Sequence, residues 1–434
     1  MEKWDFDEQG KAIVHRTAEH WRPIGNGVIE CDLCYRSCRL DPGQAGWCKI
    51  RGNQGGEMTL TDHGVLSALI LQRRGFQVDP FMTYKPGALS LFVGGVSCTS
   101  KCTFCMSKEI TWNPAAVPWL YGIERTPAMG LFYTMRGLVH PAGLINLAKM
   151  IGCTQIEFGI NEPLLTYEYT LDAARLACEA GLEVVIETNG FSKPEVVHEL
   201  APYVAAVDLG VKGGGDPVFY DRWMKSPGAM DVVKESALAW RKAGVHLIIG
   251  DVIAPMQLQS DQAFKESTRE FYSWVRDHLG ELTEILPTPL LYPGASSSSN
   301  KSGYLLPSTA SRLDETKYTF RLHSAVNLAR DLGLPYAHHK TVKDSIRCHQ
   351  CGSELLTFLP PSVYCEPCLM PFQFCDRWGV IQYVDEGGYC SNCGTKVPVV
   401  PQSQDEIERM DEALKNLPDE LVYKGKVVFR PVMD

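Results

Sequence analysis

The sequence has no apolar run that approaches the roughly 18 residues of a membrane-spanning helix. Its first residues, Met1–Asp7, lack the apolar core of a secretory signal peptide. It also lacks an excess of positive charge, because 42 Lys and Arg residues against 51 Asp and Glu residues give a net charge of −9. These absences argue against a membrane protein, a secreted protein and a protein that binds nucleic acid phosphates. We therefore expect a cytoplasmic protein without a nucleic acid or membrane partner.

Cysteines are too few for a disulfide scaffold in 434 residues, but their distribution is informative. Of the 16 cysteines, four lie between positions 31 and 48, three between 98 and 105, and seven between 348 and 393. In a reducing cytosol, grouped cysteines are more often metal ligands than disulfide partners. The two that stand apart, Cys153 and Cys178, are expected to be small buried side chains of the core.

From about residue 86, apolar runs of strand length alternate with segments of helix length. The expected strands are 89–96, 155–160, 183–187, 206–211, 246–253 and 284–291. The expected helices are 141–151, 167–180, 194–200, 230–243, 262–279 and 315–332. Strands that alternate with helices form βα units around a parallel sheet. Six such units predict an α/β fold, a partial (βα)6 barrel with its chemistry at the carboxyl ends of the strands.

Three domains are expected. They are an N-terminal cysteine-rich module at 1–85, the partial barrel at 86–340, and a zinc-ribbon-like module with the C-terminal tail at 341–434. Residues 31–60 are interpreted as a glycine-rich knuckle rather than a packed element. The aromatic and proline-rich insertion at 107–139 is either a substrate lid or cofactor wall, or a packed surface excursion. Apolar positions in 407–417 predict an amphipathic helix, and 421–429 predicts a strand.

The central cysteines, Cys98, Cys102 and Cys105, follow directly after the first expected strand. Thiolates hold iron–sulfur clusters, and a [4Fe–4S] cluster usually has four of them. Three close cysteines leave one iron free for a small molecule. A zinc site would require a fourth protein ligand, and the next few residues offer none. The spacing favours a cluster and leaves zinc or free thiols as alternatives.

The Cys-x3-Cys-x2-Cys spacing, with an aromatic residue before the last cysteine, resembles the signature of radical S-adenosylmethionine enzymes. Residues 161–169 and the N-terminal cysteine segment resemble the AmmeMemoRadiSam subgroup, which is related to the activases of pyruvate formate-lyase. The resemblance implies a partial (βα)6 barrel, a [4Fe–4S] cluster at Cys98, Cys102 and Cys105, and S-adenosylmethionine chelated to its fourth iron. Reductive cleavage of that cofactor would give a 5′-deoxyadenosyl radical.

The same resemblance implies a set of residues that contact S-adenosylmethionine. They are Phe104, Asn161, Glu162, Glu187, Asn189, Asp208 and Lys212. The subgroup has Asp-Leu-Lys on the fourth strand, whereas here Gly210 and Val211 lie between Leu209 and Lys212. Asn161 and Glu162 have an alternative role, since residues of these types also cap a helix such as the one expected near Leu164.

The outer cysteines form two further groups. Cys31, Cys34, Cys38 and Cys48 suit tetrahedral zinc or mononuclear iron, with an auxiliary iron–sulfur cluster as the alternative. The paired knuckles Cys348-x2-Cys351 and Cys390-x2-Cys393 predict a zinc site, as in the C-terminal ribbon of the subgroup. Cys365, Cys368 and Cys375 lie between the knuckles, either as a further metal site or as alternative ligands of the first.

The expected activity is hydrogen abstraction from a protein or peptide substrate, a post-translational modification implied by the resemblance to activases. Reduction of the cluster would require an electron donor such as ferredoxin or flavodoxin. Two reactions stay open: generation of a glycyl radical, and cobalamin-dependent carbon methylation as in the modification of methyl-coenzyme M reductase. The sequence has no Asp-x-His-x-x-Gly cobalamin motif. A non-enzymatic zinc-ribbon adaptor is the alternative from another class.

Overall fold

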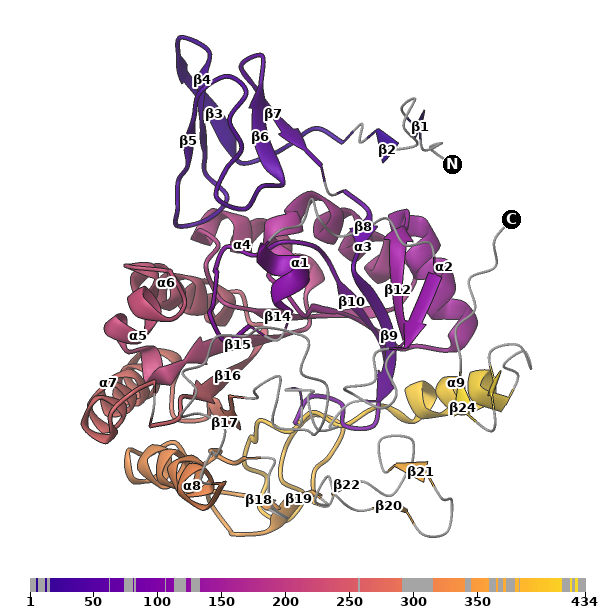
Figure 1. The fold of residues 1–434 in the computed structure, drawn as a ribbon. Coiled ribbons are helices and arrows are strands. Elements are labelled where there is room, and N and C mark those ends of the chain that lie inside the picture. Colours follow the sequence, from indigo (N-terminus) through magenta and orange to yellow (C-terminus); the bar gives the residue numbers. More distant parts are fainter. Residues whose placement is uncertain are drawn as a thin grey trace.

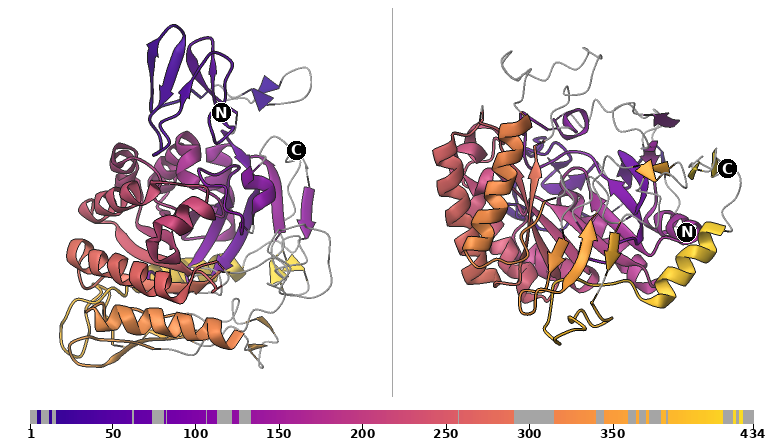
Figure 2. Two further views of the ribbon diagram at one scale, coloured as in Figure 1. Left: turned by 60° about the vertical axis from the view of Figure 1, so that its left-hand side comes forward. Right: turned by 90° about the horizontal axis from the view of Figure 1, so that it is seen from below.

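The computed structural model describes most of the chain. The described residues are 5–6, 12–13, 16–61, 63–73, 81, 83–105, 107–112, 122–125, 133–256, 258–290, 315–339, 345–358, 364–365, 370–371, 379–381, 383–415, 422–423 and 426–427. A central sheet with its helices lies between a group of N-terminal strands at the top of Figure 1 and a group of C-terminal strands at the bottom. The left view of Figure 2 shows the same arrangement after a turn about the vertical axis.

The central sheet has seven strands in the order β17-β16-β15-β14-β13-β10-β9. Its strands are β9 (Ala68–Arg73), β10 (Leu89–Gly94), β13 (Gln155–Gly159), β14 (Glu183–Thr188), β15 (Ala206–Lys212), β16 (His246–Ile253) and β17 (Glu284–Pro289). The strands from β10 to β17 are parallel, and β9 runs antiparallel to β10. The predicted α/β fold with a parallel sheet is therefore confirmed. Chain neighbours are sheet neighbours, which is consistent with a partial (βα)6 barrel.

Helices follow the parallel strands along the chain. They are α2 (Pro141–Ile151), α3 (Tyr167–Glu179), α4 (Pro194–Leu200), α5 (Pro217–Arg222), α6 (Ala229–Lys242), α7 (Asp261–Leu279) and α8 (Glu315–Asp331). Proline stands in the first turn of α2, α4 and α5, where its missing N–H costs no intrahelical bond. The left-handed Gly152 ends α2, and the Ser260 hydroxyl accepts from the Ala263 amide at the start of α7. These local signals explain why the predicted helix bounds agree closely with the structure.

The two faces of the sheet have different chemistry, because successive residues of a strand point to opposite sides. One face packs against the helices through residues that include Val184, Ile186, Val207, Leu209 and Ile249. On the other face, the amino-terminal half contributes Val185, Ala206, Ile248 and Leu286 to a second core, beside the polar residues Gln155, Glu183, His246 and Glu284 that begin the strands. The carboxyl half of that face carries acidic residues and glycines: Glu157, Gly159, Glu187, Asp208 and Gly250.

The N-terminal cysteine module, residues 16–61, is built from short strands. They are β3 (Trp21–Gly25), β4 (Val28–Cys31), β5 (Arg39–Leu40), β6 (Arg51–Gln54) and β7 (Glu57–Leu60). Strands β3, β4 and β5 form one antiparallel sheet, and β6 and β7 form a hairpin. Ile29, Leu33, Leu40, Ile50 and Met58 are buried here. The interpretation of residues 31–60 as an unpacked knuckle was therefore wrong, because strands this short leave little periodicity in the sequence.

The C-terminal cysteine module, residues 345–400, packs on the amino-terminal half of the second face of the sheet. Its three-stranded sheet consists of β18 (Ser345–Arg347), β19 (Glu354–Phe358) and β22 (Gly379–Ile381). Ile346, Leu355, Leu356, Val397 and Val399 share the second core with the parallel strands. Beyond this module comes α9 (Gln404–Lys415), where the sequence predicts a helix. The single strand predicted at 421–429 was wrong, because the chain forms two short antiparallel strands there, β23 (Val422–Tyr423) and β24 (Lys426–Val427).

The insertion after the central cysteines is described only in part. It contains α1 (Lys108–Trp112), β11 (Gly122–Arg125) and β12 (Tyr133–Leu138), and β12 also pairs with β8 (Val65–Leu66). Cys153 is buried as expected, but Cys178 is exposed in the last turn of α3, so its assignment to the core was wrong. Among the helices of the described residues, none is both long and apolar enough to span a membrane.

Candidate functional site

The three central cysteines lie on the loop after β10, at the carboxyl edge of the sheet. Cys98 and Cys102 are buried, and Cys105 is partly buried. The Ser100 amide donates to Cys98 Sγ at 3.4 Å, and its hydroxyl lies 3.2 Å from Cys102 Sγ. The hydroxyl of Thr111, on α1, lies 3.4 Å from Cys105 Sγ. Hydrogen bonds to sulfur orient thiolate ligands and tune the potential of an iron–sulfur cluster, so this loop fits a cluster held by three cysteines.

Asn161 holds the cysteine loop from the end of the neighbouring strand. Its Oδ1 accepts from the Gly95 amide at 3.0 Å, and its Nδ2 donates to the carbonyl oxygens of Val96 and Ser97 at 3.2 and 2.9 Å. Asn161 is thus a positioning residue for the loop. Its predicted contact with S-adenosylmethionine stays a prediction.

The other side of the loop is held by the segment that follows α5. The amides of Lys101 and Thr103 donate to the carbonyl oxygens of Met224 and Trp223 at 3.0 and 2.8 Å. The Ser100 hydroxyl also donates to the Met224 carbonyl at 2.8 Å. Sequence reasoning did not identify this segment, because the contacts are made by backbone atoms and leave no residue pattern.

Glu162, Asn189 and Lys212 form one polar chain that reaches the cluster loop. Glu162 is fully buried and accepts from the Thr188 hydroxyl at 2.8 Å, and from the Asn189 amide and Nδ2 at 2.9 and 3.1 Å. Asn189 Nδ2 also lies 3.9 Å from Cys98 Sγ, and Lys212 Nζ donates to Asn189 Oδ1 at 2.7 Å. Lys212 enters the site because β15 continues through this residue.

Glu162 also has the capping role that the sequence left as an alternative. Its Oε1 accepts from the Leu164 amide at 3.2 Å, at the start of the 3-10 helix Pro163–Thr166. One carboxylate therefore fixes this helix start and the Asn189 side chain together. Because Asn189 faces Cys98, the helix start and the cluster loop are positioned by the same group.

Glu187 and Asp208 lie on the polar half of the sheet's second face. A Cβ at Gly159 would lie 2.7 Å from Glu187 Oε2, and one at Gly250 would lie 2.5 Å from Asp208 Oδ1. Glycine at these positions lets each carboxylate lie against the backbone of a neighbouring strand. Phe104 is buried, with its ring 5.5 Å from that of Phe219 on α5. The predicted cofactor contacts of these three side chains stay predictions.

Burial changes the acidity of the groups around the loop. It raises the pKa of Cys102 to about 11 and also raises the pKa of Cys98 and Cys105. Burial likewise raises the pKa of Glu162, against the hydrogen bonds from Thr188 and Asn189 that lower it. The thiols are therefore protonated without a metal, and the binding of iron must release their protons.

The N-terminal cysteine module lies at the same edge of the sheet as the central cysteines. The Ser97 hydroxyl donates to the Cys48 carbonyl at 2.5 Å, and Arg36 Nε donates to the Thr99 carbonyl at 2.8 Å. Cys34 forms a β-bridge with Ser192, in the loop after β14. The cluster loop is thus in direct contact with the module.

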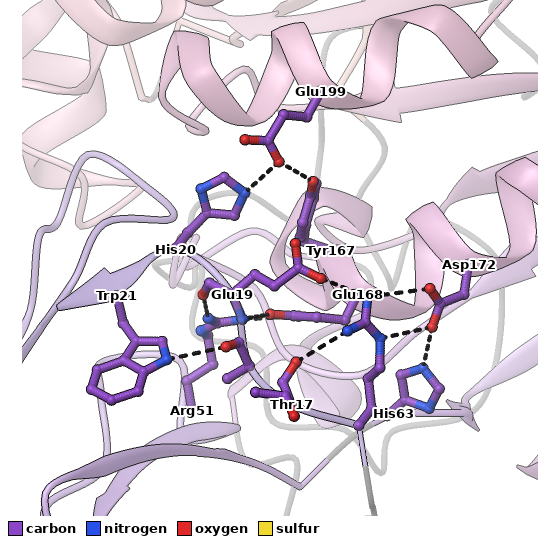
Figure 3. Close-up of polar contacts among 12 residues, drawn as sticks. Thr17, Glu19, His20, Trp21, Arg51, His63, Tyr167, Glu168, Asp172 and Glu199 are labelled. Atoms are coloured by element: carbon purple, nitrogen blue, oxygen red, sulfur yellow. Dashed lines mark hydrogen bonds and ion pairs between the residues drawn. The ribbon is translucent and has the colours of Figure 1, made fainter.

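A network of charged groups joins the module to α3 (Figure 3). Arg51 and Glu168 form a buried ion pair, with Arg51 Nη1 at 2.8 and 2.9 Å from the two carboxylate oxygens. Arg16 and His63 both contact Asp172 one turn further along the helix, at 3.0 and 3.1 Å. Because an uncompensated buried charge is costly, this network fixes the module on the helix.

The four cysteines of the N-terminal module surround one cavity. Its walls include Cys31, Cys34, Cys38 and Cys48 together with Thr99 of the cluster loop. Burial raises the pKa of the Cys48 thiol to about 11 and also raises that of Cys34. The structure thus brings the four predicted ligands together around a shared space.

The four outer cysteines of the C-terminal module converge on a single point. The sulfur atoms of Cys348, Cys351, Cys390 and Cys393 all lie within 4.8 Å of one another. Cys348 Sγ and Cys393 Sγ are 3.6 Å apart, and Cys351 Sγ and Cys390 Sγ are 3.7 Å apart. This geometry can hold one tetrahedral metal ion. Of the inner cysteines, Cys368, Cys375 and the side chain of Cys365 lie outside the described residues.

Comparisons with known proteins found several similar chains. The uncharacterized protein MJ0808 of Methanocaldococcus jannaschii is 24% identical over 404 residues, covering 89% of this chain and 99% of that protein. SuiB of Streptococcus suis, solved with S-adenosylmethionine, is 12% identical with a TM-score of 0.38, over 57% of this chain and 49% of SuiB. This chain therefore spans about half the length of SuiB.

QueE of Escherichia coli is 12% identical with a TM-score of 0.31, over 52% of this chain and 84% of QueE. The family model described as the radical SAM superfamily matches residues 93–271. The matched segment contains the three cysteines of the loop after β10 and the polar chain from Glu162 to Lys212. Through this segment, the chain is similar to the radical SAM superfamily.

Proposed function

We propose that the protein cleaves S-adenosylmethionine reductively at a [4Fe–4S] cluster and uses the resulting radical to abstract hydrogen from a protein or peptide. The observation that carries the proposal is the loop after β10, on which each of three cysteine sulfurs has a nearby hydrogen-bond donor. With cluster and cofactor bound, one electron from a donor such as ferredoxin or flavodoxin yields methionine and the 5′-deoxyadenosyl radical. Hydrogen transfer then gives 5′-deoxyadenosine and a substrate radical.

In this proposal, Cys98, Cys102 and Cys105 hold the cluster, and Asn161 keeps their loop in shape. Asn189 lies between Cys98 and Lys212, so its amide is suited to orient a ligand beside the cluster. Glu162 is already bonded to three donors on Thr188 and Asn189, and we assign it to positioning Asn189. Glu187 and Asp208 lie on the polar half of the sheet, where carboxylates can accept hydrogen bonds from a zwitterionic ligand or its ribose.

The proposed substrate class is a protein or peptide. It is supported by the resemblance of residues 161–169 to the subgroup related to activases that act on protein backbones. Two reactions follow from that resemblance, glycyl-radical formation and methylation with cobalamin as carrier. The matched family model supports an enzyme over a non-enzymatic zinc-ribbon adaptor.

The test is an anaerobic assay on the full chain, reconstituted with iron and sulfide and reduced with dithionite. We expect release of 5′-deoxyadenosine and methionine from S-adenosylmethionine. Cys102→Ala should remove this activity and lower the iron content, whereas Cys178→Ala should leave both unchanged because Cys178 is exposed on α3. A Cys102→Ala protein that cleaves the cofactor at the normal rate would contradict the proposal.

Product analysis separates the two reactions. A methylated peptide and cobalamin absorption bands would support methyl transfer, whereas a glycyl radical signal on a partner protein would support activation. Deuterium at a defined peptide position should appear in 5′-deoxyadenosine when that position is the site of abstraction.

A further inference from the structure

We propose that the N-terminal cysteine module binds a second, polynuclear iron–sulfur cluster rather than a single metal ion. The inference concerns Cys31, Cys34, Cys38 and Cys48 and does not depend on the substrate or reaction proposed above. It follows from the spacing of the thiols, the cavity between them and two buried donors without a partner.

The spacing of the thiols separates this site from the C-terminal one. A tetrahedral ion with metal–sulfur bonds of about 2.3 Å requires sulfur atoms roughly 3.8 Å apart. The C-terminal cysteines meet this requirement at 3.6 and 3.7 Å. Within the described residues, only they and the group Glu19, His20 and Glu199 have three or more candidate ligand atoms all within 4.8 Å of one another.

The N-terminal cysteines are not among those groups, and neither are Cys98, Cys102 and Cys105. A cluster needs wider spacing than a single ion, because each cysteine binds a different iron. The central cysteines, to which the proposed function assigns a cluster, provide a comparison on which this step rests. Like those three, the N-terminal four lie farther apart than one tetrahedral ion requires.

The cavity between the N-terminal thiols supports the same conclusion. The cavity has a volume of about 20 Å³, and one buried water requires roughly 10–15 Å³. The four thiols therefore surround an open space. In the C-terminal site, by contrast, paired sulfurs lie only 3.6 and 3.7 Å apart.

Two buried donors at the cavity have no hydrogen-bond partner among the described residues. They are Nε of Arg51 and the hydroxyl of Thr99, and both residues line the cavity. Arg51 is only 1% exposed, and Thr99 only 2%. A buried donor without an acceptor is costly, and an unseen ion or group is one explanation for it. The sulfide and thiolate sulfurs of a cluster would give both donors an acceptor.

The test begins with the triple variant Cys98→Ser, Cys102→Ser and Cys105→Ser, which removes the central ligands and keeps all four N-terminal thiols. After anaerobic reconstitution, iron and acid-labile sulfide should fall from about eight of each per chain to about four, if both clusters are cubanes. Mössbauer spectra should show sulfide-bridged iron. Iron without sulfide, zinc in place of iron, or no metal beyond that of the C-terminal cysteines would overturn the inference.

Further variants in this background locate the remaining cluster. Cys34→Ser with Cys48→Ser should remove it, whereas the matched pair Cys365→Ser with Cys368→Ser should retain it. Iron and sulfide that survive the first pair would overturn the inference.

Because Cys34 and Cys48 are buried and their loss could unfold the module, Thr99→Val offers a variant with all four thiols intact. It should lower the reduction potential of the remaining cluster by removing one donor to sulfur, and an unchanged potential would contradict the assignment of Thr99 to the cluster.

Discussion

The two outer cysteine modules share a ligand type but differ in position and construction. The N-terminal module contacts the loops after β10 and β14, at the carboxyl edge of the sheet. The C-terminal module packs on the amino-terminal half of the second face, at the other end of the molecule (Figures 1 and 2). In folds built from βα units, the carboxyl edge carries chemistry and the opposite edge contributes stability.

The cysteines of the two modules also differ in their exposure and in the spacing of their sulfur atoms. Cys351 and Cys393 are exposed, and their sulfurs are already close enough for one ion. Cys31, Cys34 and Cys48 are buried around a cavity, and the Cys48 carbonyl accepts a hydrogen bond from Ser97 of the cluster loop. From this difference we infer that a metal held by the C-terminal cysteines would be structural, whereas one held by the N-terminal cysteines would lie beside the machinery at the carboxyl edge.

Removal of the C-terminal metal should have the largest effect on stability. Structural zinc contributes apparent binding energies of about 10–16 kcal/mol to the folding of small zinc domains. A strong chelator should reach Cys351 and Cys393, open residues 345–400 to proteolysis, and leave the iron of the buried sites in place. Time-resolved proteolysis with mass spectrometry checks this expectation. Loss of iron before any cleavage in 345–400 would mean that the chelator reaches the buried iron sites first, which would contradict this prediction.

Breaking the buried ion pair of the N-terminal module should have the next largest effect. Glu168→Gln leaves Arg51 buried and without its counter-charge, which we expect to cost about 3–5 kcal/mol of unfolding free energy. The matched change in the C-terminal module is Glu354→Gln, which breaks a largely exposed pair with Arg347 and should cost at most about 1 kcal/mol. Denaturant unfolding measures both variants. Equal losses would show that burial does not distinguish the two modules.

The contrast between these pairs also shows what sequence could predict. The parallel strands and helices were predictable because each is a continuous run with its own local end signals, such as Gly152 after α2. The pairing of Arg51 with Glu168 was not, because 117 positions separate the two residues and neither has a local partner that marks it. The short strands of the N-terminal module were missed for a related reason, since their register depends on pairing rather than on periodicity.

The sequence predicted some features of the candidate site and missed others. The grouping of Cys98, Cys102 and Cys105 was visible in the sequence because they lie on one loop, and the family resemblance then predicted them as cluster ligands where spacing had left zinc or free thiols open. The position of Lys212 depended on where β15 ends, and the subgroup pattern alone left it ambiguous. The positioning role of Asn161 was hidden, because its partners are backbone atoms of the cysteine loop. Cys178 was misjudged because a helical position alone did not reveal its exposure in the last turn of α3.

Removal of a hydrogen bond to a cysteine sulfur should have an intermediate effect. The effect should differ between the cluster loop and the C-terminal module. Asn189→Ala deletes the donor near Cys98 and releases Lys212, and we expect cofactor cleavage to fall about 10- to 100-fold. Thr395→Val deletes the hydroxyl 3.4 Å from Cys393 Sγ, and it should weaken zinc binding without changing cleavage. Cleavage rates and zinc affinity are measured for both variants. A slower cleavage rate in Thr395→Val would mean that the C-terminal site is coupled to the chemistry.

A turn that requires glycine provides the smallest and most local test of the structural role of the C-terminal module. Gly352 follows the first knuckle with φ of +75° and has no atom within 4 Å of a Cβ position. An alanine there would meet no steric obstacle but would hold a left-handed backbone, which costs about 1–2 kcal/mol. Gly352→Ala should therefore lower the melting temperature of the C-terminal module while iron content and cofactor cleavage stay unchanged. Gly394→Ala, at φ of +74° after the second knuckle, should behave alike because the two knuckles have the same geometry. A loss of iron in either variant would indicate that the module also supports the clusters at the far edge of the sheet.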